Sequence, residues 1–273
     1  MKLGVVIRNM GPAATRETIS ACARAAEAAG LDDVWLTDHI AIPPDDAEGS
    51  GGRYFDPLAT LAYLAGVTSE IGLATGVLIL PYRPPLPTAK AIATVQELSG
   101  GRLKLGVGVG WMAAEFRALG VDRSQRGRLT DQTLAFFRRC FDDDAVDANG
   151  QPFLFEPRPP RPPIYVGGAP PHAFERAIRY GDGWLPMGGD VEKLRPQISQ
   201  FREAADRAGV PPPEVVLMTT LTADPAGAAA QVRAFAEIGV THLVLGSRYG
   251  NVSEFRENLE ILVKHVLPVV SSL

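Results

Sequence analysis

Short runs of aliphatic and β-branched residues alternate along the chain with longer stretches in which apolar residues recur at helical spacing. Runs such as Val5-Val6-Ile7 and Leu243-Val244-Leu245 are apolar at every position. Continuous apolar runs are typical of strands buried on both faces, as in parallel sheets whose crossovers are helices. Eight strands are predicted, over residues 3–7, 33–37, 72–80, 103–109, 164–166, 183–187, 215–221 and 243–246.

A helical pattern follows each of these strands. The predicted helices cover residues 15–29, 57–68, 87–98, 127–141 (with a short piece at 113–119 before it), 171–180, 191–208, 226–238 and 253–266. Strict alternation of eight strands with eight helices predicts an α/β fold, a single (β/α)8 TIM barrel over residues 1–273. A doubly wound open sheet is the alternative, but eight units favour closure.

Three segments depart from this alternation. Residues 43–52 are polar and rich in proline and glycine, which predicts a loop or lid. Residues 146–155 are expected to form a hairpin around Asn149-Gly150, because this dipeptide suits a two-residue turn. The proline-rich residues 157–163 cannot be helical.

Composition narrows the possible partners. The 273 residues carry a net charge of −4 without a block of like charges, which argues against a nucleic-acid partner. No stretch resembles a signal peptide or a membrane span, so a cytoplasmic protein without a membrane partner is expected. Cys22 and Cys140 lie among apolar neighbours and are predicted to be core residues in a reducing compartment. No Cys pair or His-x-x-x-His suggests a metal site.

Unusual residues stand at the ends of three predicted strands. These are Asp38-His39 after the second, Gly106-x-Gly108-x-Gly110 at the fourth and Gly167-Gly168-Ala169 after the fifth. In a (β/α)8 barrel all strand ends meet at the face that carries the active site. An imidazole for proton transfer would then share one mouth with backbone that a ligand can approach closely. Each motif is alternatively an ordinary turn.

The glycine pair also opens a helix, where free N–H groups and the helix dipole favour an anion. Pro170 and Pro171 remove two donors, which leaves the amides of Gly168, Ala169 and His172. The glycine triplet lacks the Gly-x-Gly-x-x-Gly spacing of a Rossmann fold. Together the motifs predict an enzyme that binds a phosphorylated cofactor. Trp111 and Arg248 are substrate candidates, and both are alternatively structural or solvated residues.

Several motifs in order along the chain resemble the bacterial luciferase-like superfamily, and specifically its deazaflavin-dependent branch. The matching segments are Thr37-Asp38-His39, Thr75-Gly76-Val77-Leu78, Leu98-Ser99-Gly100-Gly101-Arg102, Leu105 to Trp111 with Glu115-Phe116, Val166-Gly167-Gly168 and Gly181-Asp182-Gly183-Trp184. The resemblance implies a barrel that binds coenzyme F-420, or alternatively FMN, at its strand ends, and a homodimer.

The resemblance also implies roles for individual residues. A bulge with a non-proline cis peptide is expected at Gly76-Val77, behind the cofactor ring. Asp38 and His39 would contact the ring, with His39 as the catalytic proton donor. Gly108, Val109 and Gly110 would lie beside the cofactor side chain, and Gly167, Gly168 and Ala169 would hold its phosphate.

One position departs from the family pattern. Relatives that oxidise sugar phosphates carry a Glu directly after the last glycine of the turn, where this chain has Trp111. Sugar-phosphate oxidation is therefore not expected, and Trp111 could form an apolar wall for a small-molecule substrate. The predicted function is F-420-dependent hydride transfer to or from a small organic substrate. The alternatives are an FMN-dependent monooxygenase that uses oxygen and a cofactor-binding protein without turnover.

Overall fold

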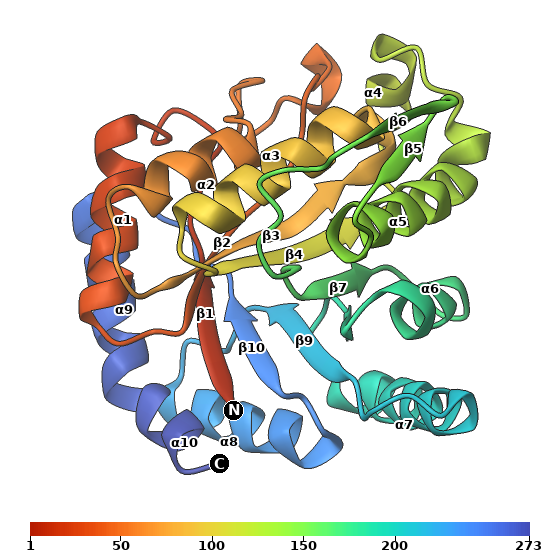
Figure 1. The fold of residues 1–273 in the computed structure, drawn as a ribbon. Coiled ribbons are helices and arrows are strands. Elements are labelled where there is room, and N and C mark those ends of the chain that lie inside the picture. Colours follow the sequence, from red (N-terminus) through yellow and green to blue (C-terminus); the bar gives the residue numbers. More distant parts are fainter.

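The computed structural model describes residues 1–273 and contains a closed barrel of eight parallel strands (Figure 1). The order around the barrel is β1-β10-β9-β8-β7-β4-β3-β2. The barrel strands are β1 (Lys2–Val6), β2 (Asp33–Leu36), β3 (Gly72–Ile79), β4 (Leu103–Gly108), β7 (Ile164–Gly167), β8 (Gly183–Leu185), β9 (Glu214–Thr219) and β10 (His242–Leu245). The predicted (β/α)8 fold is confirmed, and the open sheet is excluded because each of the eight strands pairs with two neighbours and none is an edge strand.

Helices form the outer layer of the barrel. They are α1 (Arg16–Ala28), α2 (Pro57–Ala65), α3 (Pro85–Leu98), α4 (Ala113–Ala118), α5 (Arg126–Asp142), α6 (His172–Tyr180), α7 (Val191–Ala208), α8 (Pro225–Ile238), α9 (Val252–His265) and α10 (Leu267–Ser271). Local chemistry sets several starts: the side chains of Thr15 and Asp56 accept backbone N–H bonds at the first turns of α1 and α2. The short α10 was not predicted.

The hairpin outside the barrel is confirmed. β5 (Val146–Ala148) pairs antiparallel with β6 (Gln151–Phe153). Asn149 and Gly150 both have positive φ, as a two-residue turn of this kind requires. The polar residues 43–52 contain one 3-10 turn, Pro44–Asp46, and otherwise form turns and irregular structure, as the predicted loop requires.

Strand β3 is irregular near its end. Its register against β4 shifts between Thr75 and Leu78, and the Gly76–Val77 peptide is cis. The bulge and cis bond expected from the family resemblance are therefore confirmed.

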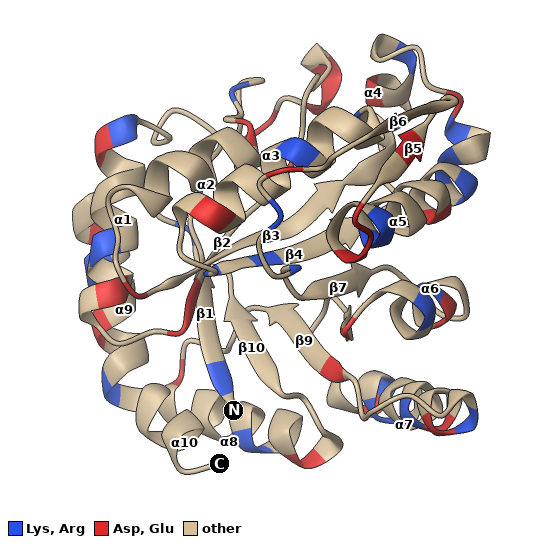
Figure 2. Cartoon of the chain, viewed as in Figure 1, with Lys and Arg blue, Asp and Glu red and all other residues tan.

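Two apolar layers hold the fold together. A large layer between strands and helices contains Cys22 and Cys140, which are both free and fully buried as predicted. A smaller layer fills the barrel with Trp35, Ala74, Tyr165, Leu185, Val216, Met218 and Val244. Acidic and basic residues are interspersed over the outer helices (Figure 2). None of the helices is both long and apolar enough to cross a membrane.

Candidate functional site

A cavity of about 290 Å³ opens at the carboxyl ends of the barrel strands. It brings together the three predicted strand-end motifs, which lie far apart in the sequence. Its lining consists of Thr37, Asp38, His39, Gly76, Val77, Ile79, Gly108, Val109, Gly110, Trp111, Gly167, Gly168, Leu185 and Met187. We refer to it as the mouth cavity.

The floor of the mouth cavity is largely backbone. A Cβ atom on Gly108 would come within 2.6 Å of Val77 Cγ2, and one on Gly167 within 3.1 Å of Val77 Cγ1. Both glycines therefore make room for Val77, the residue after the cis peptide. The result is a mostly apolar surface lined by five glycines, where a ligand can approach the backbone closely, and this suits a planar, polar-edged ring such as a flavin or deazaflavin.

His39 lies at the edge of this floor, with its side chain 15% exposed. Its Nδ1 is 2.7 Å from Oε2 of Glu115, while Nε2 makes no hydrogen bond within the protein. The rings of Tyr54 and Trp111 pack edge-to-face against the imidazole, with centroids 5.1 and 6.0 Å away. One ring nitrogen is therefore fixed by the protein and the other is available.

Glu115 comes from α4 and is fully buried at 0% exposure. Its Oε1 accepts the N–H groups of Ile40 at 2.6 Å and Ala41 at 3.0 Å. Its Oε2 accepts the Tyr82 hydroxyl at 3.0 Å in addition to facing His39. Burial alone would raise the pKa of Glu115, but these backbone N–H groups and the imidazole outweigh burial and hold that pKa below its usual range. Burial and the nearby carboxylate raise the pKa of Tyr82.

Asp38 is buried beneath the same edge and is paired on both oxygens. Arg83 donates from Nη1 to Oδ2 at 2.5 Å and from Nη2 to Oδ1 at 2.8 Å, and Oδ2 also accepts the Ile79 N–H at 2.8 Å. Burial raises the pKa of Asp38, and the guanidinium and the N–H group oppose that effect. Arg83 also bonds Asp56, so this cluster ties the ends of β2 and β3 to the start of α2.

Asn9 links β1 to the same edge. Its fully buried side chain donates to the carbonyl oxygens of Thr37 and Phe55 and accepts the N–H and hydroxyl of Thr37. Three of these four hydrogen bonds hold Thr37, the residue directly before Asp38 and His39, and the fourth ties Asn9 to the segment at Phe55.

A second cavity, of about 540 Å³, continues from the mouth cavity and shares Val109, Gly167 and Gly168 with it. We call it the basic cavity, because three arginines from α5 and α6 line it: Arg126, Arg128 and Arg176. Arg176 is paired with Asp131 at 2.7 Å. Arg126 and Arg128 bond only neutral groups, so two positive charges remain unbalanced.

Free backbone donors face this region. The amides of Gly168, Ala169 and His172 donate no hydrogen bond within the protein. The Gly168 carbonyl accepts from Trp184 Nε1 at 2.9 Å, and in a trans peptide the following N–H points the opposite way. Because the indole is buried, the Ala169 N–H is directed outward. The turn is therefore able to bind an anion.

The other sequence candidates lie in different places. Trp111 lines the mouth cavity and is 64% exposed. Arg248 lies on an exposed loop after β10 and lines neither cavity. Trp35 and Trp184 are buried, as expected of packing residues. No cluster of His, Cys, Asp or Glu in the structure could hold a metal ion.

Sequence reasoning missed most of the residues that hold the site in place. Asn9, Tyr54, Tyr82 and Arg83 were not singled out, and Glu115 was named only as part of a family motif, without a role. Glu115 follows the glycine turn by five residues and precedes a buried Phe116, so an acidic residue on the apolar side of a short helix was the available signal. The other four carry no local signal, because their partners come from distant segments.

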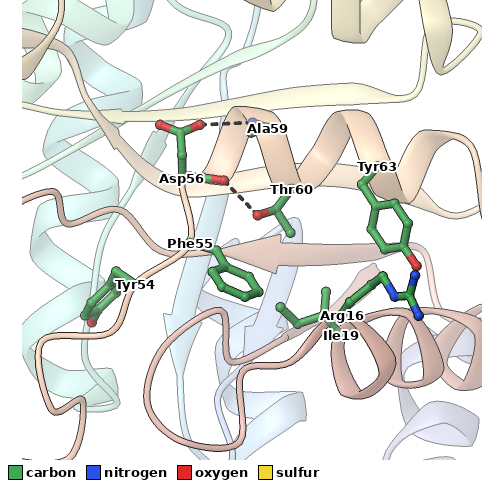
Figure 3. A pocket seen from close by; sticks show the side chains of 8 residues that line it. All are labelled: Arg16, Ile19, Tyr54, Phe55, Asp56, Ala59, Thr60 and Tyr63. Atoms are coloured by element: carbon green, nitrogen blue, oxygen red, sulfur yellow. Dashed lines mark hydrogen bonds between the residues drawn. The ribbon is translucent and has the colours of Figure 1, made fainter.

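A further cavity, of about 440 Å³, lies outside the barrel between α1 and α2 (Figure 3). Asp56 is the only acidic residue lining it, and Figure 3 shows this residue bonded to Ala59 and Thr60 at the start of α2. No strand end reaches this cavity, so we place the chemistry in the mouth cavity.

Curated proteins with similar sequences cover most of the chain. An uncharacterised protein of Mycobacterium tuberculosis is 30% identical over 247 residues, 83% of each chain. An F420-dependent hydroxymycolic acid dehydrogenase of the same species is 32% identical over 206 residues, 72% of this chain and 56% of that protein.

Solved structures share the fold. An F420-dependent secondary alcohol dehydrogenase, in complex with an F420-acetone adduct, superposes with a TM-score of 0.80 at 19% identity and covers 98% of each chain. The oxygenating component of 3,6-diketocamphane monooxygenase from Pseudomonas putida, in complex with FMN, has a TM-score of 0.80 at 15% identity, with 99% of this chain and 98% of that chain covered. The sequence profile of the luciferase-like monooxygenase family matches residues 1–265, and the chain therefore belongs to that family.

Proposed function

We propose that the chain is an oxidoreductase that binds coenzyme F-420 across the mouth and basic cavities and acts on a small organic substrate. The observation that carries this proposal is their continuity: a glycine-floored cleft for a planar ring leads over Gly167-Gly168 into a cavity with two unbalanced arginines. Coenzyme F-420 has this shape, a flat ring followed by a phosphodiester and several carboxylates. FMN ends in one phosphate.

The proposal assigns the coenzyme to residues that line the two cavities. Gly76, Val77, Gly108, Val109 and Gly110 would support the ring and side chain. Gly167, Gly168 and Ala169 would bind the phosphate through free amides. Arg126 and Arg128 would face the carboxylates beyond it.

His39 is proposed as the catalytic residue. When bound, the coenzyme supplies or accepts the hydride. One hydride and one proton together reduce one double bond of the substrate, and His39 donates that proton from its free ring nitrogen; in the reverse direction it accepts it. Asp38 would act chiefly by fixing the strand end beside the ring, because both its oxygens are already bonded to protein groups.

The substrate is proposed to be apolar next to the reacting bond. Trp111 and Met187 line the mouth and are exposed, as is the neighbouring Ile40, and no free charged side chain accompanies them. Trp111→Glu should lower kcat/KM for apolar alcohols or ketones by about tenfold or more, since it places a charge against the substrate. Trp111→Phe is the matched control. An unchanged substrate range in the Glu variant would contradict this role for Trp111.

Fluorescence titration of cofactor-free protein with oxidised coenzyme F-420 and, separately, with FMN tests the proposal. Tight binding of coenzyme F-420 with FMN binding at least about tenfold weaker is the expected result. Preference for FMN would support the second candidate, an FMN-dependent monooxygenase, whose FMN-bound structural neighbour shares this fold. Oxygen consumption with reduced FMN would then be the decisive assay.

One alternative function and two further expectations remain proposals. Binding of coenzyme F-420 without hydride exchange towards any alcohol or ketone would support the third candidate, a cofactor-binding protein without turnover. The homodimer and the cytoplasmic location implied at the sequence level are testable by sedimentation velocity and by cell fractionation.

A further inference from the structure

We infer that Glu115 is a positioning residue that fixes the tautomer of His39, so that Nε2 is the nitrogen that exchanges protons in the mouth cavity. The inference rests on the proposed function only for its consequence in catalysis. The tautomer itself follows from the contacts of Glu115 in the protein.

The hydrogen-bond donors around Glu115 determine its charge. Three donors whose role does not depend on the His39 tautomer bind its carboxylate: the N–H groups of Ile40 and Ala41 on Oε1 and the Tyr82 hydroxyl on Oε2. With these donors in place and its pKa held below the usual range, the carboxylate is ionised at neutral pH. An ionised carboxylate only accepts hydrogen bonds.

The ionised carboxylate determines which nitrogen of the His39 imidazole carries a proton. Because Oε2 can only accept and lies 2.7 Å from Nδ1, Nδ1 must carry a proton. In the neutral ring this leaves Nε2 bare and able to accept a proton. In the charged ring Nε2 carries a proton and can donate it. Since Nε2 has no partner in the protein and His39 lines the mouth cavity, Nε2 is available to exchange a proton there in either state.

The carboxylate of Glu115 also fixes the backbone directly after His39. Oε1 binds the amides of the next two residues, Ile40 and Ala41. One buried side chain therefore orients the ring and anchors the start of the loop over residues 43–52. Neither function can be replaced by solvent, because Glu115 is fully buried.

The isosteric change Glu115→Gln gives a distinctive prediction. The two backbone N–H groups require the carboxamide oxygen at the Oε1 position, so the NH2 group must face His39 and Tyr82. An NH2 group donates to Nδ1, which must then be bare, and the ring proton moves to Nε2. The variant should therefore invert the tautomer while filling the same space.

Two-bond 1H–15N NMR spectra of the cofactor-free protein at about pH 8.5, above the titration range of free imidazoles, measure this directly. The chain has four histidines, and His39→Asn identifies the signal. The wild type should show protonated Nδ1 and bare Nε2, and Glu115→Gln the reverse. Glu175→Gln is the matched control, because Glu175 lies 3.4 Å from the exposed His172 and should leave its tautomer unchanged.

The outcomes are separable. A wild-type spectrum with bare Nδ1 and protonated Nε2 overturns the inference without any variant, as does folded Glu115→Gln with an unchanged tautomer. If Glu115→Gln does not fold, Tyr82→Phe keeps the carboxylate and must keep protonated Nδ1. With coenzyme F-420 present, Glu115→Gln should retain affinity within about threefold and lose about 10²-fold or more in turnover. Failure of the wild type to bind the coenzyme would overturn the proposed function alone.

Discussion

The barrel holds two histidine–carboxylate pairs, one at each end, and their surroundings differ. At the mouth, His39 faces Glu115, is partly exposed and keeps Nε2 free in a cavity. At the opposite end, His242 Nε2 lies 2.9 Å from Asp33 Oδ2, and both side chains are fully buried. Lys104 also pairs with Asp33. The same two chemical groups thus form an accessible pair beside a cavity in one place and a buried cluster with Lys104 in the other.

The two pairs consist of the same residue types or close relatives and differ mainly in their exposure to solvent. Burial alone would raise the pKa of Asp33, but His242 and Lys104 hold that pKa below its usual range. The Trp35 ring packs edge-to-face against His242, with the two ring centroids 5.5 Å apart. None of the three cavities described above is lined by these residues, so we expect the cluster to contribute to stability alone, and the mouth pair chiefly to turnover.

The largest effect is expected from Asp33→Ala at the sealed end. Removal of the carboxylate leaves Lys104 and His242 without their partner, which should lower the free energy of unfolding by about 3–5 kcal/mol. Urea denaturation measures this. Asp142→Ala, which breaks an exposed ion pair with Arg138, is the control and should cost less than about 1 kcal/mol. Equal losses of unfolding free energy for both variants would mean that the buried cluster stabilises the protein no more than an exposed ion pair does.

His39→Asn should show the opposite profile. Turnover should fall by about 10²-fold or more, since the proposed proton donor is lost. Stability should change by about 1 kcal/mol or less, because the imidazole is partly exposed and makes one hydrogen bond. Steady-state kinetics and urea unfolding on the same sample test both halves. Unchanged turnover would remove His39 from catalysis.

The pH dependence of stability should reveal Glu115. Its pKa is lowered in the folded state, so its stabilisation is present above the unfolded value of about 4.5 and is lost as the pH falls through the folded value. The difference in unfolding free energy between wild type and Glu115→Gln should be about 2 kcal/mol at pH 7 and should shrink towards pH 3. A difference independent of pH would mean that the ionised form is not preferred.

The smallest effects are expected at the rim of the site, by which we mean Arg126 and Arg128 in the basic cavity, because both side chains are at least partly exposed. Arg126→Gln and Arg128→Gln should each weaken coenzyme F-420 binding by about three- to tenfold, with a smaller salt dependence than wild type. Arg138→Gln, on the same helix but outside the basic cavity, is the matched control. Binding unaffected by both rim variants would show that the carboxylates of the coenzyme lie elsewhere.

Local patterns accounted for the fold with few errors. Apolar strand runs and helical spacing predicted all eight barrel strands, and Asn149-Gly150 predicted the hairpin, because these signals depend on neighbouring residues only. The helix α10 was missed because it is short and follows α9 almost without a break. The helix α3 was predicted, but it begins at Pro85 rather than at residue 87. Prolines at the start of α3 obscured its first turn.

The sequence by itself determined that strand-end motifs would meet at one mouth, since a (β/α)8 barrel leaves them no other place. Only the tertiary structure decided what each motif contacts. Asp38 faces Arg83, and His39 faces Glu115, 76 residues away. Such pairings depend on loop paths and on which face of a helix is buried. Neither is encoded in local periodicity, so a buried carboxylate becomes recognisable as the partner of His39 only once the barrel has closed.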